Sequence, residues 1–305
     1  MEVLFKVGIS VACIVAITWA WRLLEWVWLR PKALEKQLRQ QGLSGNPYRL
    51  LYGDVNDRTT MALQAMSKPI DFTNNYVHRV MPFRYQTIKK HGNHAFMWNG
   101  PTPVVFITEP ELIREVFNKY RDYQKPKGNP LGQLLAPGFI QFEGDKWAQH
   151  RKLMNPAFHV EKLKVTMILH EVLRLYSPVT ELQRKTDHDI QLGDLLLPAG
   201  IIVDAPIILA HYNPKFWGED VKEFNPERFS DGISKATNGN NSFFPFGWGP
   251  RICIGQNFAL AEAKLALTMI LQRFAFRLSP SYVHAPVMAL LLVPQHGIQL
   301  ILERI

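Results

Sequence analysis

Apolar residues are concentrated in one long run at the N-terminus of the chain. No residue from Val7 to Trp21 is charged, and the apolar character continues to Leu24. With Lys6 extended toward the surface, residues 4–24 approach the roughly 20 residues that a helix needs to cross a bilayer. The pattern therefore predicts a transmembrane helix over residues 4–24, with an interfacial aromatic belt made by Trp19, Trp21, Trp26 and Trp28.

Basic residues lie mainly on the C-terminal side of this run. Only Lys6 precedes it, whereas these follow it: Arg22, Arg30, Lys32, Lys36 and Arg39. The positive-inside rule then predicts that the bulk of the chain faces the cytosol. A cleaved signal peptide ending near Ala20 is the alternative. It is disfavoured because the apolar character continues past Ala20, and because a secreted product would carry an odd thiol at Cys253.

Residues 25–47 indicate a juxtamembrane linker. A short charged helix from Pro31 to about Gln41 is followed by a turn-rich hinge, residues 42–47. Further on, β-branched and aromatic residues on both sides of the turn at 99–101 predict a hairpin over 95–107. A second hairpin is expected around Pro294-Gln-His-Gly297, closing the chain.

Helical periodicity appears in four other places. Helices are predicted over 109–120, from about 143, over 165–176 and over 257–274. The helix over 165–176 has one apolar stripe and is stopped by Pro178. The helix over 257–274 is apolar on most of its circumference, which predicts deep burial.

Composition excludes disorder as the main state and allows a sizeable core. The chain has 305 residues, 47% of them hydrophobic, and we expect residues 48–164 and 165–305 to form one domain. A net charge of +9 invites a nucleic-acid partner, but the basic residues are scattered and form no familiar module, so none is expected. Two cysteines, Cys13 and Cys253, make a disulfide framework implausible and indicate a reducing compartment.

The candidate chemistry centres on the segment Phe246-Gly-Trp-Gly-Pro-Arg-Ile-Cys-Ile-Gly255. Free N–H groups at the start of the next helix, the helix dipole and the cation Arg251 should lower the pKa of the Cys253 thiol. Gly249 and Gly255 would let the backbone pass close to a flat ligand. The loop predicts a thiolate that holds a metal, with a buried structural cysteine as the alternative.

Two further pairs belong with this loop. Glu-x-x-Arg occurs three times, but only Glu171 and Arg174 lie on a strongly apolar helix, where paired charges need a third partner. Arg228, in Pro226-Glu-Arg-Phe229, would be that partner. Trp147 and Arg151, at i and i+4, present an indole N–H and a guanidinium on one helical face, which suits a carboxylate.

The cysteine loop matches, without insertion or deletion, the pattern Phe-x-x-Gly-x-Arg-x-Cys-x-Gly of the heme-thiolate monooxygenases, the cytochrome P-450 family. The chain resembles most the plant membrane-bound members of the secologanin-synthase-like branch. Four segments carry that closer resemblance: Trp28-Leu-Arg-Pro-Lys32, Gly45-Asn-Pro-Tyr-Arg-Leu50, Asn155-Pro-Ala-Phe-His159 and Trp217-Gly-Glu-Asp220.

The resemblance implies heme b as the cofactor, with Cys253 as the axial thiolate on its iron. It implies that the heme is contacted by Trp147, Arg151, Phe246, Gly249, Arg251 and Gly255, the Trp147–Arg151 pair meeting a propionate. Glu171, Arg174 and Arg228 would form a buried triad behind the cysteine loop. The endoplasmic reticulum membrane, an NADPH–cytochrome reductase, dioxygen and an apolar plant metabolite of the terpenoid kind are implied as location, partner and substrates.

The same resemblance implies a mainly α fold with a small β-sheet region, from which the central helices are absent. Arg151 and Glu171 are 20 residues apart, whereas the family has on the order of two hundred residues between them. The seam lies between about Lys164 and Val165. The missing part includes the helix that crosses the distal face of the heme with its acid–alcohol pair. We therefore expect a heme-binding chain whose hydroxylase activity is in doubt.

Two alternatives stay open. One is a heme-thiolate isomerase or dehydratase that rearranges a hydroperoxide without a reductase, although such relatives usually alter the cysteine loop, which is unaltered here. The other is a non-catalytic membrane protein, with or without heme. For the leading hypothesis, positive charge for reductase docking is offered by Lys146, Lys152 and Lys264.

Overall fold

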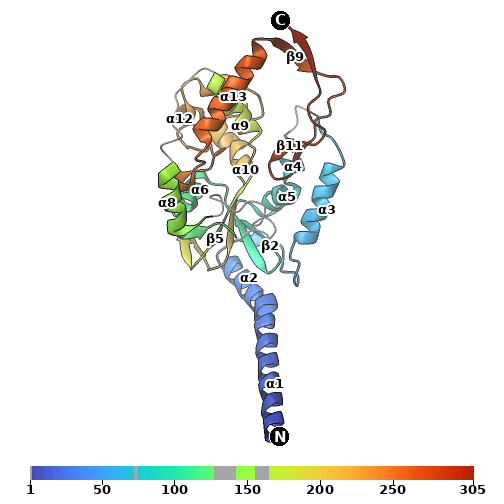
Figure 1. Cartoon of the computed structure of the whole chain (residues 1–305), viewed down its shortest axis with the longest axis vertical. Helices are drawn as coiled ribbons and strands as arrows, with labels where there is room; N and C mark the ends of the chain where they lie inside the picture. Colours follow the sequence, from blue (N-terminus) through green and yellow to red (C-terminus); the bar gives the residue numbers. More distant parts are fainter. Residues whose placement is uncertain (1, 72–74, 127–141, 155–164) are drawn as a thin grey trace.

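The structure is a computed structural model that describes residues 2–71, 75–126, 142–154 and 165–305 (Figure 1). The helices and helical turns are α1 (Glu2–Leu24), the π-turn η1 (Glu25–Leu29), α2 (Arg30–Gln40), α3 (Val55–Met66), α4 (Val77–Val80), α5 (Pro82–His91), α6 (Pro110–Asn118), α8 (Gly144–Met154), α9 (Val165–Leu175), α10 (Ile207–His211), α11 (Pro214–Trp217), η4 (Pro226–Phe229), α12 (Ile233–Ala236), η5 (Gly249–Arg251) and α13 (Gln256–Leu271). The strands are β1 (Ser44–Gly45), β2 (Ala95–Asn99), β3 (Thr102–Phe106), β4 (Tyr123–Gln124), β5 (Leu182–Thr186), β6 (Ile190–Leu192), β7 (Leu195–Leu197), β8 (Ile202–Ala205), β9 (Phe274–Leu278), β10 (Pro286–Met288), β11 (Leu292–Pro294) and β12 (Leu300–Arg304). The fold is mostly helical with small sheets, as predicted.

One six-stranded sheet organises the core, in the order β1-β2-β3-β8-β5-β4. The hairpin predicted over 95–107 is confirmed as β2 and β3, which pair antiparallel with Phe96 opposite Val105. Strand β8 arrives from the C-terminal half and pairs parallel with β3, placing Val203 opposite Val105. Since these three side chains are almost fully buried, the sheet joins the halves before and after the seam through one core.

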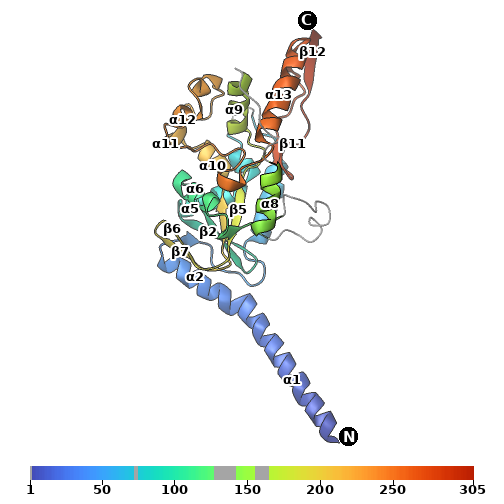
Figure 2. The same ribbon diagram turned by 60° about the vertical axis from the view of Figure 1, so that its left-hand side comes forward.

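The predicted transmembrane helix is a helix that stands away from the folded body, with the N-terminus at its far end (Figures 1 and 2). It is long and apolar enough to cross a membrane, and none of its apolar window is buried in the protein. At the π-turn η1 it continues directly into α2. A membrane anchor fits this arrangement.

The juxtamembrane segment differs from the predicted linker, because it packs on the domain. Leu38 of α2 is fully buried. The Gln41 side chain exchanges two hydrogen bonds with the backbone of Leu196, at 2.8 and 2.6 Å. The Tyr48 hydroxyl donates to the Val27 carbonyl at 2.6 Å. The turns at 42–47 are therefore fixed on both sides and do not form a free hinge.

Two expectations about the C-terminal region are wrong. The predicted helix over 257–274 is present as α13, but it is not deeply buried: Phe258 is 61% exposed and Leu265 is 64% exposed. Residues 294–297 connect β11 to β12 and do not make a hairpin, because β12 pairs with β9 and β11 pairs with β10. Local pattern could not show either outcome. Burial of α13 requires a packed neighbour, and the strand that pairs with β12 lies on the far side of the β10–β11 pair in the sequence.

Candidate functional site

The cysteine loop is a tight turn that places Cys253 just before α13. The Cys253 N–H donates to the Phe246 carbonyl at 2.8 Å, which closes the loop. The half-buried Phe246 thus acts through its backbone, while the neighbouring Trp248 ring meets Phe244 edge-on. Cys253 itself is exposed. Exposure and a position at a helix N-terminus make Cys253 accessible to a ligand.

The two glycines that the sequence singled out have different surroundings. Gly249 has a φ of +70°, and a Cβ there would lie 2.7 Å from the Asn118 Oδ1 atom and 2.9 Å from the Phe117 carbonyl oxygen. Its lack of a side chain serves packing against α6. At Gly255, a Cβ would meet only the Cys253 sulfur within 4 Å, at 3.9 Å. The space beside the sulfur is therefore open.

Arg251 joins the cysteine loop to the start of α8. Its side chain is 3% exposed and forms a two-pronged ion pair with Glu143, one N–H···O contact being 2.7 Å. The guanidinium also lies 5.2 Å from the Trp147 ring and 5.6 Å from the Tyr120 ring. Because Glu143 neutralises this cation, Arg251 holds the loop in place from behind. No motif pointed to Glu143 as the partner of Arg251, because the two residues are 108 positions apart.

Helix α8 brings the predicted Trp147–Arg151 pair to the loop. Trp147 is buried, whereas Arg151 is partly exposed and donates to the Ile252 carbonyl at 2.5 Å. Burial lowers the pKa of Arg151, and the charge of a Cys253 thiolate opposes that shift. The guanidinium and the sulfur are thus within electrostatic reach of each other, on the open side of the loop.

The predicted triad is present but is larger than predicted. Glu171 and Arg174 are fully buried and form a bidentate pair, at 2.8 and 2.7 Å. Arg228 lies 3.7 Å from Glu171 but bonds more closely to Asp220, at 2.7 and 3.0 Å. Hydrogen bonding from Arg228 lowers the pKa of Asp220. With Asp220 included, the cluster has two cations, Arg174 and Arg228, and two carboxylates, Glu171 and Asp220.

The other two Glu-x-x-Arg pairs do not resemble this cluster. Glu111 and Arg114 form a surface pair at 3.2 Å. Glu181 does not pair with Arg184: it bonds to Arg84, which also bonds to the buried Asp204. Of the three motifs, only Glu171 and Arg174 form a fully buried ion pair.

The Cys253 side of the site fits heme in its donor chemistry. The exposed Cys253 thiol has open space beside Gly255, and Arg151 contacts the same loop and supplies a cation of the kind that pairs with a carboxylate. Among the described residues, no group of three or more His, Cys, Asp or Glu side chains is placed to bind a metal ion directly. Cys253 and Arg151 are of the residue types that a thiolate-ligated heme would use.

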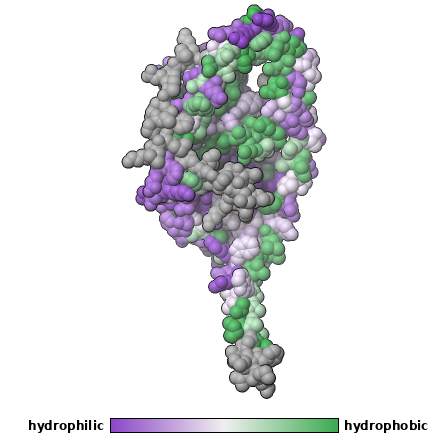
Figure 3. Space-filling view, viewed as in Figure 1, coloured by the Kyte–Doolittle hydropathy of each residue, from purple (hydrophilic) through white to green (hydrophobic). Residues whose placement is uncertain are grey.

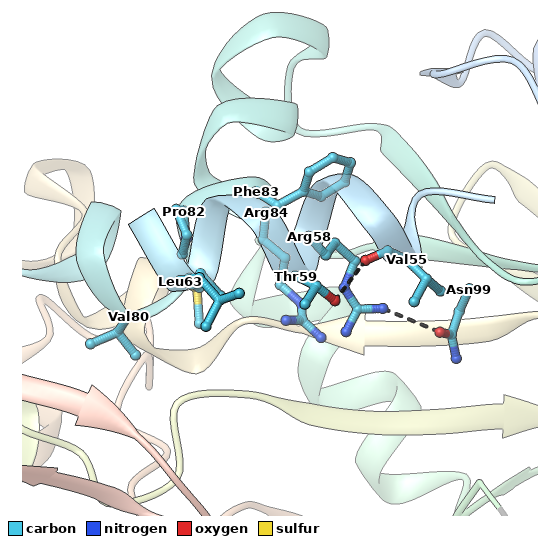
Figure 4. A pocket seen from close by; sticks show the side chains of 11 residues that line it. Val55, Arg58, Thr59, Leu63, Val80, Pro82, Phe83, Arg84 and Asn99 are labelled. Carbon is cyan, nitrogen blue, oxygen red and sulfur yellow. Dashed lines mark hydrogen bonds between the residues drawn. The ribbon is translucent and has the colours of Figure 1, made fainter. Parts of the chain in front are cut away.

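A separate cavity of about 360 Å³ lies between α3 and the α4–α5 region (Figure 4). Arg58 and Arg84 point into it between apolar walls, and Arg58 donates to the Asn99 amide oxygen at 3.2 Å. None of its lining residues belongs to the cysteine loop or to α8. This cavity is therefore distinct from the Cys253 site.

Comparison with known families gives a match to the profile of the family described as Cytochrome P450, over residues 76–167 and 161–302. The two matched stretches meet at 161–167, where the seam was predicted. Among solved structures, the fold is similar to a retinoic acid bound cyanobacterial CYP120A1, with a TM-score of 0.66 and 16% identity over 77% of this chain and 98% of that chain. That likeness concerns the fold.

Curated relatives come from plants. Cytochrome P450 72A397 of Kalopanax septemlobus is 33% identical over 94% of this chain and 96% of its own length. Echinocystic acid 23-monooxygenase of Saponaria officinalis is 31% identical over an alignment of 521 positions that covers all of both chains. Because this chain has 305 residues, at least 216 of those positions (521 less 305) have no residue here. The relatives contain a large segment that this chain lacks.

Proposed function

Because this chain belongs to the cytochrome P450 family, in its plant secologanin-synthase-like branch, we propose that it is a membrane-anchored heme-thiolate protein that has lost unaided hydroxylase activity. The family consists of heme monooxygenases, and heme is its cofactor. Support for retained heme binding comes from one observation above all. Cys253 is exposed at the start of α13, beside Arg151, on a loop braced by buried charges.

Each residue of the loop has a proposed task toward the cofactor. Cys253 would supply the thiolate ligand to iron, and Arg151 would pair with a propionate. Arg251 and Glu143 would keep the loop closed against α8, while Glu171, Arg174, Asp220 and Arg228 hold the segment behind it. When bound, a thiolate-ligated heme activates dioxygen for insertion of one oxygen atom into a C–H bond.

Loss of unaided activity follows from what the described residues do not provide. Oxygen activation needs protons delivered on the face of the heme opposite Cys253, and it needs water excluded from that face. In the family, the central segment does both, and its positions are missing from this chain. An uncovered face favours the release of reduced oxygen species over product.

Location and partners are part of the same proposal. The anchor helix supports membrane attachment, and we place the protein in the endoplasmic reticulum with its folded part in the cytosol. The electron donor would be an NADPH–cytochrome reductase, docking near Lys146 and Lys264; the Lys152 side chain lies outside the described residues. The substrate class would be apolar terpenoids, since a relative is named for its action on echinocystic acid.

The reduced, carbon-monoxide-bound absorption spectrum of the full chain in microsomes tests heme binding. We expect a Soret band typical of thiolate ligation, which Cys253→Ser abolishes and Cys13→Ser leaves unchanged. Cys13 is the matched control because it is the other cysteine of the chain and lies in the anchor. Absence of the band in the unmodified chain would favour a heme-free membrane protein.

Activity is tested separately, with reductase, NADPH and echinocystic acid, beside the Saponaria officinalis relative. We expect NADPH oxidation with hydrogen peroxide as the main product and no hydroxylated acid. Turnover at the rate of that relative would refute the loss of activity. Rearrangement of a fatty-acid hydroperoxide without NADPH would favour the isomerase alternative.

A further inference from the structure

A large apolar surface is uncovered at the C-terminal end of the molecule. It is made by one side of α13, by the two-stranded sheet of β9 and β12, and by part of α9. We call it the α13 face, and its large apolar residues, each between 39% and 64% exposed, are Ile168, Val172, Phe258, Leu265, Met269, Phe276, Leu278, Leu300 and Leu302. In Figure 3 apolar residues gather at the upper right of the molecule, near the place of β9 in Figure 1, while the topmost residues are hydrophilic. Because α13 contacts α9 and β9, and β9 pairs with β12, these exposed residues lie on neighbouring elements. Exposed apolar surface shared by neighbouring elements is typical of an interaction site.

The membrane does not cover this face. The anchor α1 leaves the body at the opposite end from β9 and β12, in both ribbon views (Figures 1 and 2). A bilayer that contains α1 therefore lies far from α13. The face is left for water or for another polypeptide.

The position of the seam indicates which polypeptide fits. Helix α9 begins at Val165, directly after the break, and it packs against α13. A segment that enters the chain at Val165 therefore joins it beside the α13 face. The Saponaria officinalis relative carries at least 216 additional alignment positions, and the two profile matches overlap at 161–167. The segment that this chain lacks would therefore enter it next to the exposed α13 face.

We propose that the α13 face binds, as a separate chain, a helical polypeptide equivalent to the central segment of the full-length relatives. The association is non-covalent and is stabilised by burial of the exposed apolar residues of α9, α13, β9 and β12. Two copies of this chain can pair through the same face when the segment is absent, and we expect the segment to displace such a pair. The proposal is independent of heme, because it concerns packing alone.

Co-expression tests the proposal directly. The segment of the Saponaria officinalis relative that falls opposite the gap is expressed with its own affinity tag, together with the full anchored chain. We expect the two to co-purify from detergent-solubilised membranes at equal stoichiometry. Failure of the segment to co-purify would overturn the proposal.

A matched pair of variants shows whether the α13 face is the binding surface. Leu265 and Leu63 are both helical leucines, 64% and 63% exposed, and Leu63 lies on α3, outside the face. Leu265→Glu should lower the co-purified segment at least tenfold, whereas Leu63→Glu should leave it unchanged. Equal effects of the two variants would contradict the proposal.

Two controls remove the remaining explanations. The melting temperature of Leu265→Glu without the segment should equal that of the unmodified chain, because the side chain is exposed; unfolding of this variant would contradict the exposed face. The mass of the solubilised chain is measured by analytical ultracentrifugation. A dimer that Leu265→Glu dissociates, and that the segment does not displace, would show that a second copy is the occupant and overturn the proposal.

Discussion

At the scale of single residues, Arg174 shows why a buried charge is tolerated next to the cysteine loop. Its five guanidinium N–H donors meet five acceptors: both Glu171 oxygens and the carbonyls of His211, Val221 and Glu223, at 2.7 to 3.2 Å. A fully desolvated guanidinium without these partners would be strongly destabilising. The residue thus ties α9 to the segment before the loop.

Replacing Arg174 with lysine tests this network. Lysine keeps the charge but has three donors on one atom in place of a planar fork. We expect Arg174→Lys to lower the free energy of unfolding by about 3–5 kcal/mol. Arg114→Lys, in the exposed pair with the same spacing, should change it by less than about 0.5 kcal/mol. Urea denaturation of both variants measures the difference, and similar losses would contradict the buried network.

His211 is a second buried group that supports the loop. Its Nε2 atom accepts the Phe244 N–H at 2.9 Å, nine residues before Cys253. Burial, helped by the nearby Arg174 charge, lowers the pKa of His211 to about 3. The neutral ring is therefore the folded form at neutral pH.

A pH dependence follows from the lowered pKa of His211. An unfolded histidine takes up a proton near its ordinary value of 6.5, whereas the folded one does not until about pH 3. The stability contribution is complete above pH 6.5 and is lost as pH falls toward 3, by about 1.4 kcal/mol for each pH unit. We expect about 2 kcal/mol from this group between pH 6.5 and pH 5.

His211→Phe provides the comparison, because it keeps a ring against Trp217 and Phe243 and removes the titration. The variant should be less stable at pH 7, since the Phe244 N–H loses its acceptor. Its stability should nevertheless fall less between pH 6.5 and pH 5 than that of the unmodified chain. Equal pH slopes in urea denaturation would contradict the assignment.

At the scale of elements, the juxtamembrane segment behaves as part of the domain. Besides the Gln41 and Tyr48 bonds, Arg30 donates to the Ala199 carbonyl at 3.2 Å, and Tyr48 packs on Trp98 with ring centroids 4.9 Å apart. A helix that leaves the bilayer and is fixed at several points sets the orientation of the domain relative to the membrane. A flexible linker would not.

Truncating a buried side chain of α2 distinguishes the two arrangements. Leu38→Ala should lower the free energy of unfolding by about 2–5 kcal/mol, because Leu38 is fully buried against the sheet. Leu50→Ala, at a 52% exposed leucine just after the same segment, should have little effect. An unchanged urea midpoint for Leu38→Ala would indicate a free linker.

At the scale of the whole molecule, the anchor is not the only apolar surface. The α13 face would remain after removal of α1, so we expect a variant that begins at Glu25 to stay associated in detergent-free buffer. Adding Leu265→Glu and Leu302→Glu should reduce the particle mass several-fold, whereas adding Leu63→Glu should not. Size-exclusion chromatography with light scattering measures the masses. A monomeric truncated chain without further substitutions would contradict this expectation.

Local pattern was sufficient to predict most of the elements. The anchor, the β2–β3 hairpin, α9 and the buried Glu171–Arg174 pair depend on residues close in sequence, whose periodicity and spacing determine the local structure. The failures share a different origin. Glu143 beside Arg251 and the pairing of β12 with β9 join residues that are far apart in the sequence. Asp220 meets Arg228 across an irregular segment, which has no periodicity to predict the contact.

The sequence by itself determined that a cysteine stands before an apolar helix, in a loop of known family pattern, and that the middle of the fold is missing. The tertiary structure decided what that means for each side chain. Arg251 turns inward to Glu143, Arg151 stays beside Cys253, and α13 is uncovered although its sequence is that of a buried helix. The physical reason is that apolar periodicity predicts which residues favour burial, whereas burial also requires a second surface to pack against. Only the folded chain shows whether that surface is present.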